Sequence, residues 1–113
     1  MRNYGAELWE KIEAGHETQE GLLLLLATLT RTAAVEKHEY GKVRALAAEE
    51  ILIHTECSPS AAVSSAERVE KVMDAKLQSD LAAGELMVVK ERLKTLDGQL
   101  KRLQSGFVSW RAP

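Results

Sequence analysis

The stretch ETQEGLLLLLATLTRTAAVEKHEYGKVRALAAEEILIHTEC, residues 17–57, decides the fold. It contains no proline, and its apolar residues recur in alternating steps of four and three. The row formed in this way is Leu22, Leu26, Leu29, Ala33, Glu36, Tyr40, Val43, Ala47, Glu50 and His54. This heptad step is typical of a long helix that packs along its length on another helix. We therefore predict one long helix over residues 17–57.

A second long helix is predicted over residues 59–109. Ser58 is a good N-cap, and Pro59 suits the first helical position because the N–H that proline lacks would have no partner there. Steps of four and three again relate the apolar residues near the end: Val89, Leu93, Leu96, Leu100, Leu103, Phe107 and Trp110. An earlier row steps only by four: Val69, Met73, Leu77 and Leu81. The change of step near Gly84 predicts a stutter in the coil.

Residues 1–15 are interpreted as a separate short helix. Leu8, Trp9 and Ile12 give it an apolar face, and Gly15 resembles a helix C-terminus because glycine tolerates the left-handed conformation. Thr18 is then a candidate N-cap for the first long helix. Packed against the far end of the second long helix, this segment would cover its terminal aromatic residues with Trp9 and Ile12.

Two long helices joined by a short connection lie antiparallel. The predicted fold is therefore all-α: a single antiparallel helical hairpin domain with a short N-terminal helix, self-associating into a bundle. The turn is expected at residues 57–60, with unbroken helix from 60 to 105. The residues expected along the seam between the helices are Tyr40, Val43, Ala47, Val89, Leu93, Leu96, Leu100 and Leu103.

Composition agrees with a single helical domain. The chain has 113 residues, of which 45% are apolar and 28% charged, which is too apolar for a disordered chain. Aromatic residues make up only 4%, which argues against a β-sandwich or small barrel. The longest apolar run, residues 22–29, would span about 12 Å of helix, far less than a bilayer core of about 30 Å. With no apolar leader at the start, we expect a cytoplasmic protein that does not contact membranes.

Self-association is predicted from the five consecutive leucines at residues 22–26. At about 100° per residue they surround the helix, and a helix that is apolar all round is buried all round. One partner helix cannot cover them, so a second copy is expected to do so, unless residues 1–15 fold over them instead. The predicted interface consists of Leu22, Leu23, Leu25, Leu26 and Leu29.

Catalytic and metal sites are not expected. Cys57 is the only cysteine, which excludes an internal disulfide and a zinc site built on several thiolates. Glu50, His54 and Cys57 share one face, but the second long helix offers no histidine or cysteine to complete a metal site. A Glu-x-x-His pair at Glu13 and His16 crosses the predicted helix end. We therefore predict no enzyme activity and no cofactor, and leave the role of Glu50, His54 and Cys57 open.

Charge is distributed unevenly. Residues 7–56 carry ten acids and five bases, a net charge of −5, and residues 85–113 carry three acids and six bases, a net charge of +3. Lys90, Lys94 and Lys101 share one helical face, which is either solvated or a small phosphate-contact surface. Glu36 and Glu50 fall on the apolar row, where charge is costly unless paired. Arg68 and Lys76 are possible partners that would set the register.

Several short segments resemble a group of small phage and prophage proteins. They are Glu39-Tyr40 through Arg44-Ala45, Ser60-Ala61-Ala62, Lys90-Glu91-Arg92-Leu93-Lys94 followed by Leu96, Gln99 and Leu100, and Ser109-Trp110-Arg111-Ala112. The similarity covers residues 36–112. Such proteins accompany recombination and replication genes, which implies an accessory role near single-strand annealing proteins. The resemblance implies no catalytic residue.

Two functions are weighed on this basis. The first is a non-enzymatic, oligomeric, phage-type helical protein that binds a further, unidentified protein as a recombination accessory factor or as an inhibitor of a host protein. The alternative is a helical module that binds nucleic acid or nucleotides through its basic C-terminal face. Salt separates the two, because phosphate binding weakens steeply with salt and apolar helix packing does not.

Overall fold

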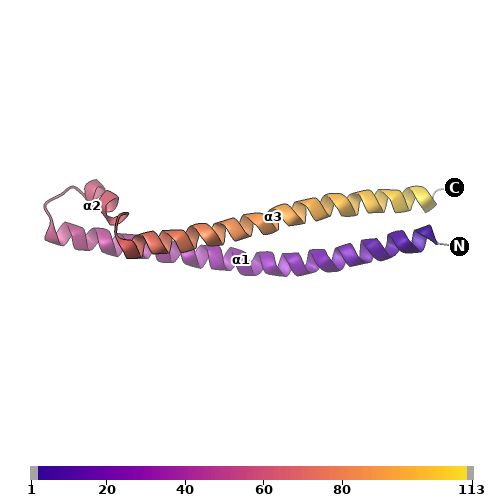
Figure 1. Cartoon of the computed structure of the whole chain (residues 1–113), viewed down its shortest axis with the longest axis horizontal. Coiled ribbons are helices and arrows are strands. Elements are labelled where there is room, and N and C mark those ends of the chain that lie inside the picture. Colours follow the sequence, from indigo (N-terminus) through magenta and orange to yellow (C-terminus); the bar gives the residue numbers. More distant parts are fainter. Residues whose placement is uncertain (1–2, 112–113) are drawn as a thin grey trace. The chain divides into compact units, whose positions relative to one another are not determined.

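The protein is all-α, as predicted. The computed structural model describes residues 3–111, and within this range the chain forms three helices and no strand (Figure 1). They are α1 (Tyr4–His54), α2 (Pro59–Ala66) and α3 (Glu70–Arg111). The chain divides into two compact units. We call residues 29–86 the three-helix unit, and residues 3–28 with 87–111 the terminal unit. The predicted segment 1–15 and the match ending at residue 112 extend beyond the described range.

The predicted break between residues 15 and 17 is wrong, because α1 continues through it. Gly15 has no positive φ, and the Thr18 hydroxyl donates to the Ala14 carbonyl oxygen at 3.0 Å, as in a helix interior. The reason lies in packing: a Cβ on Gly15 would collide with the Leu100 side chain. Glycine at this position lets α3 approach α1 closely, and it does not end the helix.

The inward face of α1 follows the heptad step well beyond the predicted row. Residues that are less exposed than their neighbours occur at Gly5, Leu8, Ile12, Gly15, Gln19, Leu22, Leu26, Leu29, Ala33, Glu36, Tyr40, Val43 and Ala47. The prediction is wrong at the end of the row, where Glu50 and His54 are exposed and Ile51 is partly buried instead. Ala48 is buried beside Ala47, so the inward face shifts by one residue as α2 joins the packing.

In the terminal unit α1 and α3 pack side by side in opposite directions (Figure 1). Gly5 faces the Trp110 ring, and ten residues further along α1 Gly15 faces Leu100, ten residues earlier on α3. The side chains most deeply buried here are aliphatic: Leu8, Ile12, Val89 and Leu100. The expected cover of the far end by Trp9 is also present, because its ring centroid lies 5.7 Å from that of Phe107.

The predicted helix over residues 59–109 is interrupted. Its start is confirmed: Ser58 caps α2 by accepting a hydrogen bond from the Ala61 N–H at 3.2 Å, with Pro59 in the first turn. However, α1 already ends at His54, and α2 ends at Ala66. Residues 67–69 form a tight bend with i to i−3 bonds, from the Arg68 N–H to the Ser65 carbonyl and from the Val69 N–H to the Ala66 carbonyl. The unbroken helix predicted from 60 to 105 is therefore wrong.

The bend lets three helices share one small core. The buried core cluster of the three-helix unit consists of Ala47 and Ala48 from α1, Ala62 and Ala66 from α2, and Val72 from α3. Ala62, Ala66 and Val72 have no exposed surface at all. Helices with such short side chains approach closely, since the distance between helix axes follows the size of the side chains in contact. A straight helix from residue 59 would not place both Ala62 and Val72 in this core.

The row predicted for the first half of α3 is also wrong. Met73, Leu77 and Leu81 are each more than half exposed. The inward residues are smaller and lie on a neighbouring row: Val72, Ala75, Ser79, Ala82, Leu86 and Val89. These steps of three and four continue without interruption past Gly84, so no stutter occurs there. Within residues 3–111, no helix has a stretch apolar enough to cross a membrane.

Candidate functional site

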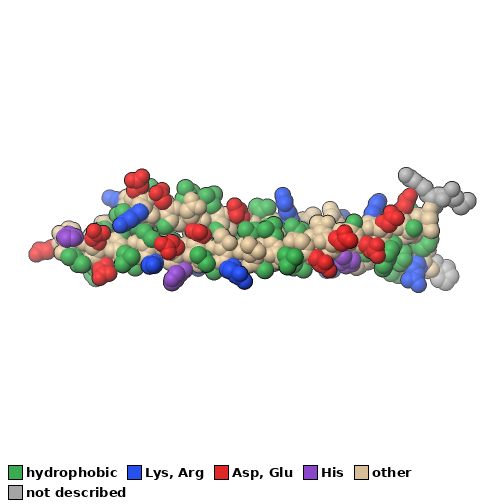
Figure 2. Space-filling model, turned by 90° about the horizontal axis from the view of Figure 1, so that it is seen from below, with side chains coloured by type: hydrophobic (Ala, Val, Ile, Leu, Met, Phe, Trp, Pro, Cys, Tyr) green, Lys and Arg blue, Asp and Glu red, His purple; other side chains and the backbone are tan. Residues whose placement is uncertain are grey.

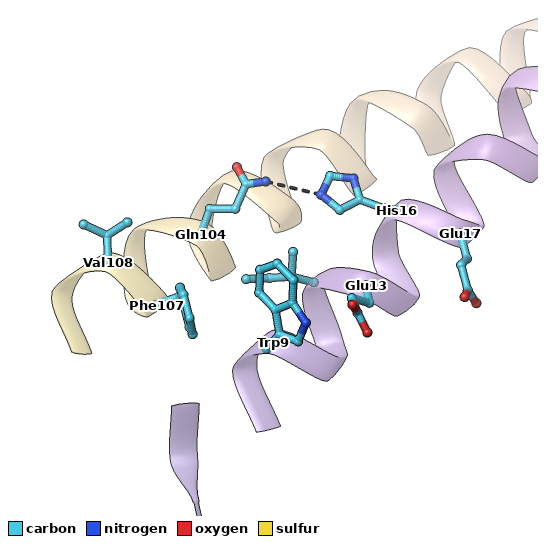
Figure 3. A pocket seen from close by; sticks show the side chains of 8 residues that line it. Trp9, Glu13, His16, Glu17, Gln104, Phe107 and Val108 are labelled. Carbon is cyan, nitrogen blue, oxygen red and sulfur yellow. Dashed lines mark hydrogen bonds between the residues drawn. The ribbon is translucent and has the colours of Figure 1, made fainter. Parts of the chain in front are cut away.

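A groove opens on one flank of the terminal unit. We call it the Trp9 groove; it has a volume of about 560 Å³ (Figure 3). Its lining comes from both helices: Trp9, Ile12, Glu13, His16 and Glu17 from α1, and Gln104, Phe107 and Val108 from α3. Because α1 is continuous, Trp9, Glu13 and Glu17 lie one turn apart on the same side of the helix. The groove therefore depends on the helix that the sequence analysis divided at Gly15.

The groove combines aromatic rings with carboxylates. The indole of Trp9 is 49% exposed, and the rings of Trp9 and Phe107 are inclined at 45°. The Nε2 atoms of Gln104 and His16 are 3.5 Å apart and link α3 to α1 above the rings (Figure 3). Glu13 and Glu17 are exposed, and the structure brings both to the groove. Chemically, the groove offers a flat π surface next to two negative charges.

The leucine run points in several directions, as its sequence requires. Leu22, Leu26 and Leu29 are partly buried on the inward side of α1. Leu23, Leu24 and Leu25 are 50%, 74% and 43% exposed. Leu24, which the predicted interface omitted, is thus the most exposed of the five. Hydrophobic side chains lie on the visible surface of the molecule among charged ones (Figure 2).

The seam residues predicted from the sequence fall on the inward sides of their helices. Ala47, Val89 and Leu100 are buried, while the remaining five are partly buried. The predicted phosphate-contact lysines Lys90, Lys94 and Lys101 are all exposed, and Lys101 Nζ pairs with Asp97 Oδ2 at 3.0 Å. The terminal unit thus separates charge: residues 4–28 carry five acids and one base, net −4, whereas residues 87–111 carry six bases and two acids, net +4.

The residues considered for metal binding do not gather. Glu50 and His54 are exposed, and Cys57 packs against the alanine core of the three-helix unit. Within the described part of the chain, no group of three or more histidine, cysteine, aspartate or glutamate side chains is placed to hold a metal ion. This holds also for Glu13, His16 and Glu17, although the continuous helix brings them to one groove.

A polar cluster in the three-helix unit was missed by sequence reasoning. The Tyr40 hydroxyl donates to the Glu67 carboxylate, with oxygen distances of 2.6 and 2.7 Å, and Arg44 Nη1 lies 3.3 Å from Glu67 Oε1. The Arg44 guanidinium also lies 5.1 Å from the centroid of the Tyr40 ring. This cluster, which we call the Glu67 clasp, ties α1 to the bend after α2. The sequence had instead predicted Arg68 and Lys76 as possible partners of the acids Glu36 and Glu50.

The contacts within the Glu67 clasp shift the pKa values of Glu67 and Tyr40. The hydrogen bond from Tyr40, followed by the bond from Arg44, holds the pKa of Glu67 below its usual value. The same carboxylate raises the pKa of Tyr40, because the phenolate would lose this hydrogen bond and meet a like charge. The only local sequence signal was the spacing of Tyr40 and Arg44, one turn apart.

Comparison with known proteins gave no match: no family model, curated protein or solved structure corresponds to this chain. The features of the molecule that bear on its function are therefore the exposed leucines and the separation of charge between α1 and α3.

Proposed function

We propose that this protein is a non-enzymatic helical protein that works by helix-to-helix binding, and that its partner is a second copy of the same chain. The observation that carries the proposal is the exposure of Leu23, Leu24 and Leu25. Full burial of one leucine is worth about 1.5–3 kcal/mol, while a whole domain is stable by only about 5–15 kcal/mol. Covering three leucines would therefore add a large share of the total stability.

The surface around these leucines suits a packed helix. Gly21 and Ala27 flank Leu24 on the same face of α1, and both are exposed. Nothing lies within 4 Å of the place where a Gly21 Cβ would be. Small residues beside a projecting leucine form the hole into which a partner's side chain inserts. The face is therefore shaped for a close helical contact.

The charge of the terminal unit favours a second copy as the partner. The α1 segment carries a net charge of −4 and the α3 segment +4. If α1 of one copy lies against α3 of another, unlike charges meet across the contact, whereas α1 against α1 would bring like charges together. One chain thus supplies both halves of a complementary pair. The further protein partner implied by the phage resemblance stays a prediction.

Sedimentation velocity at 10–100 μM tests the proposal. The wild-type protein is expected to sediment as a dimer or larger species, and Leu24→Lys as a smaller one with a lower melting temperature. Leu46→Lys is the matched control: Leu46 is 56% exposed in the three-helix unit, and the chemical change is the same. A wild-type monomer at 100 μM, or equal dissociation of both variants, would contradict the proposal.

The nucleic-acid alternative is supported by the net charge of +4 on residues 87–111. It requires a binding constant that falls with salt by a log–log slope of about −0.9 for each phosphate contacted. Fluorescence anisotropy with a labelled DNA duplex measures this slope. If Lys90 and Lys94 contact phosphates, the Lys90→Gln/Lys94→Gln variant should lower the magnitude of the slope by about 2. Weak DNA binding with the same salt slope in the variant and the wild type would exclude the face of Lys90 and Lys94 as a nucleic-acid binding surface.

A further inference from the structure

The proposed self-association rests on leucines elsewhere on α1 and on the net charge of the helices, and it gives no role to the aromatic lining of the Trp9 groove. Its volume of about 560 Å³ lies within the range of about 300–1,000 Å³ that is usual for sites of small molecules. Half of the Trp9 indole surface faces solvent although Ile12 and Phe107 offer apolar cover nearby. The lining therefore leaves an aromatic face open to a ligand.

We propose that the Trp9 groove binds a small organic cation, an amidinium, guanidinium or ammonium group on an apolar body. An aromatic face attracts a cation through its quadrupole, and the effect is largest for tryptophan. Glu13 and Glu17 follow Trp9 at one-turn intervals on α1; Figure 3 shows Glu13 beside the Trp9 ring and Glu17 one turn further from it, at the far end of the lining. The apolar body of the ligand would rest on Ile12 and Val108.

The charges around the groove exclude the opposite sign. The described residues that line it include two acids and no lysine or arginine, so an anion would meet two carboxylates. Two bases of α3 near this end of the helix have partners of their own: Lys101 pairs with Asp97, and the Arg111 guanidinium lies 5.7 Å from the Phe107 ring centroid. The contact of Arg111 shows that Phe107 accepts a guanidinium, while Trp9, which is 49% exposed, carries no cation from the described part of the chain.

The test uses benzamidinium and its neutral isostere benzamide, which share one shape and differ in charge. Titration of the full-length protein is followed by the two indole N–H signals in ¹⁵N–¹H NMR spectra, and Trp110→Phe assigns the Trp9 signal. Benzamidinium is expected to shift the Trp9 signal saturably, with a Kd at least about fivefold lower than that of benzamide. Equal affinity for the two compounds would overturn the proposal, as would no shift at 50 mM benzamidinium.

Matched variants locate the site. Glu13→Gln/Glu17→Gln removes the two acids of the groove, and Glu10→Gln/Glu20→Gln removes two exposed acids of the same helix outside it. Both change the net charge equally. The first is expected to raise the Kd of benzamidinium about fivefold and the second less than about twofold, because only the first removes the adjacent charges. Equal weakening by both would overturn the proposal by assigning binding to the overall field of α1.

A third variant and a second probe complete the design. Trp9→Leu keeps the apolar lining but removes the π face. Its binding of benzamidinium is monitored through the backbone amide signals of Glu13 and His16, and its affinity is expected to be lower by at least about fivefold. Unchanged affinity would overturn the proposal.

A blocked tripeptide, leucine-arginine-leucine, separates two sources of the cation. Tighter binding than benzamidinium supports capture of a protein's arginine side chain, and weaker binding supports capture of a free small molecule.

Discussion

The two units use opposite solutions to the same packing problem. The terminal unit has two helices, and it buries large aliphatic side chains such as Leu8 and Leu100, the second of them against Gly15. The three-helix unit buries alanines from α1 and α2 together with Val72. Two helices enclose only a narrow seam, so the terminal unit leaves Leu23, Leu24 and Leu25 uncovered. A third helix closes the core of the other unit around small buried residues, and the larger Tyr40, Val43 and Ile51 pack against them while only partly buried. The comparison teaches that the size of the apolar residues in a sequence does not predict which face of a helix is buried more deeply.

The largest expected effect is on the seam of the terminal unit. Leu100 is 3% exposed, so Leu100→Ala should lower the free energy of unfolding by about 2–5 kcal/mol, because the shortened side chain leaves a cavity above Gly15. Urea denaturation followed by circular dichroism measures the change at a fixed protein concentration. Leu77→Ala is the control: Leu77 is 54% exposed, and its loss should cost about 0.5 kcal/mol or less. Equal costs would refute the burial pattern described for α3.

The alanine core of the three-helix unit is tested by adding volume. Ala66 has no exposed surface, so Ala66→Leu should lower the free energy of unfolding by about 1–3 kcal/mol through overpacking. Ala45→Leu makes the same change at an exposed position of α1 and should be nearly neutral. The same denaturation experiment compares them. If Ala66→Leu were as stable as Ala45→Leu, α2 would not pack against α1 as described.

The Glu67 clasp predicts a dependence of stability on pH. The pKa of Glu67 is lowered by folding, so its contribution is present above its ordinary value of 4.5 and is lost as the pH falls through the folded pKa. The pKa of Tyr40 is raised above 10.0, so its contribution is present below pH 10 and is lost as the pH rises through the folded pKa.

Tyr40→Phe removes the hydroxyl of the clasp and keeps the ring. At pH 7 its melting temperature should be lower than that of the wild type, by less than the decrease expected for Ala66→Leu. The difference should shrink as the pH is lowered through the folded pKa of Glu67, because a protonated Glu67 no longer offers a charged acceptor. A difference that stays constant from pH 7 down to the lowest pH at which both proteins are folded would show that the hydroxyl acts independently of the Glu67 charge.

The smallest expected effect distinguishes glycines in the two units. Gly84 has no atom within 4 Å of a would-be Cβ, so Gly84→Ala should stabilise the protein by about 1 kcal/mol through helix propensity alone. At Gly15 the same change brings the Cβ into Leu100, and the gain should be lost or reversed. Thermal melting of both variants measures the difference. Equal stabilisation at the two sites would mean that α3 does not approach α1 closely at Gly15.

Much of the fold was predictable because heptad spacing is a local property of the sequence. The row from Leu22 to Ala47 and the later row from Val89 to Phe107 both indicated a long helix with one inward face. The capped start at Ser58 and Pro59 was equally clear, since a cap depends on adjacent residues. All-α architecture with two long helices follows from these features together.

The errors share a physical cause, which is that partners distant in sequence decided the outcome. In the sequence Gly15 resembles a helix end, but the structure shows that a glycine is needed there because Leu100 of α3 packs against it. The bend at residues 67–69 contains no proline or glycine, and contacts of Glu67 with Tyr40 and Arg44 accompany it. On α3 the larger apolar residues Met73 and Leu77 suggested the buried row, but the inward row consists of smaller ones.

The Trp9 groove could not be predicted from the sequence for the same reason. Trp9 and Phe107 were expected to lie together, but Glu13 and Glu17 belong to the Trp9 groove only if α1 continues past Gly15. Gln104 and Val108 carry no signal of their own in the sequence. Their role follows from the antiparallel register of α3 on α1, which depends on which residue of one helix faces which residue of the other.

The pairing of glycine with a large side chain also removes an ambiguity of alignment. Heptad rows are self-similar, so two helices that meet through aliphatic residues alone can slide by seven positions and still match apolar to apolar. In the terminal unit such a slip would bring Trp110 from Gly5 onto Ile12, and Leu100 from Gly15 onto Leu22. Ile12 and Leu22 carry large side chains where Gly5 and Gly15 carry none, so the slipped register would be overpacked. Gly5 receives the Trp110 ring and Gly15 receives Leu100, so the two glycines together select one register of α3 on α1 among several with the same heptad spacing.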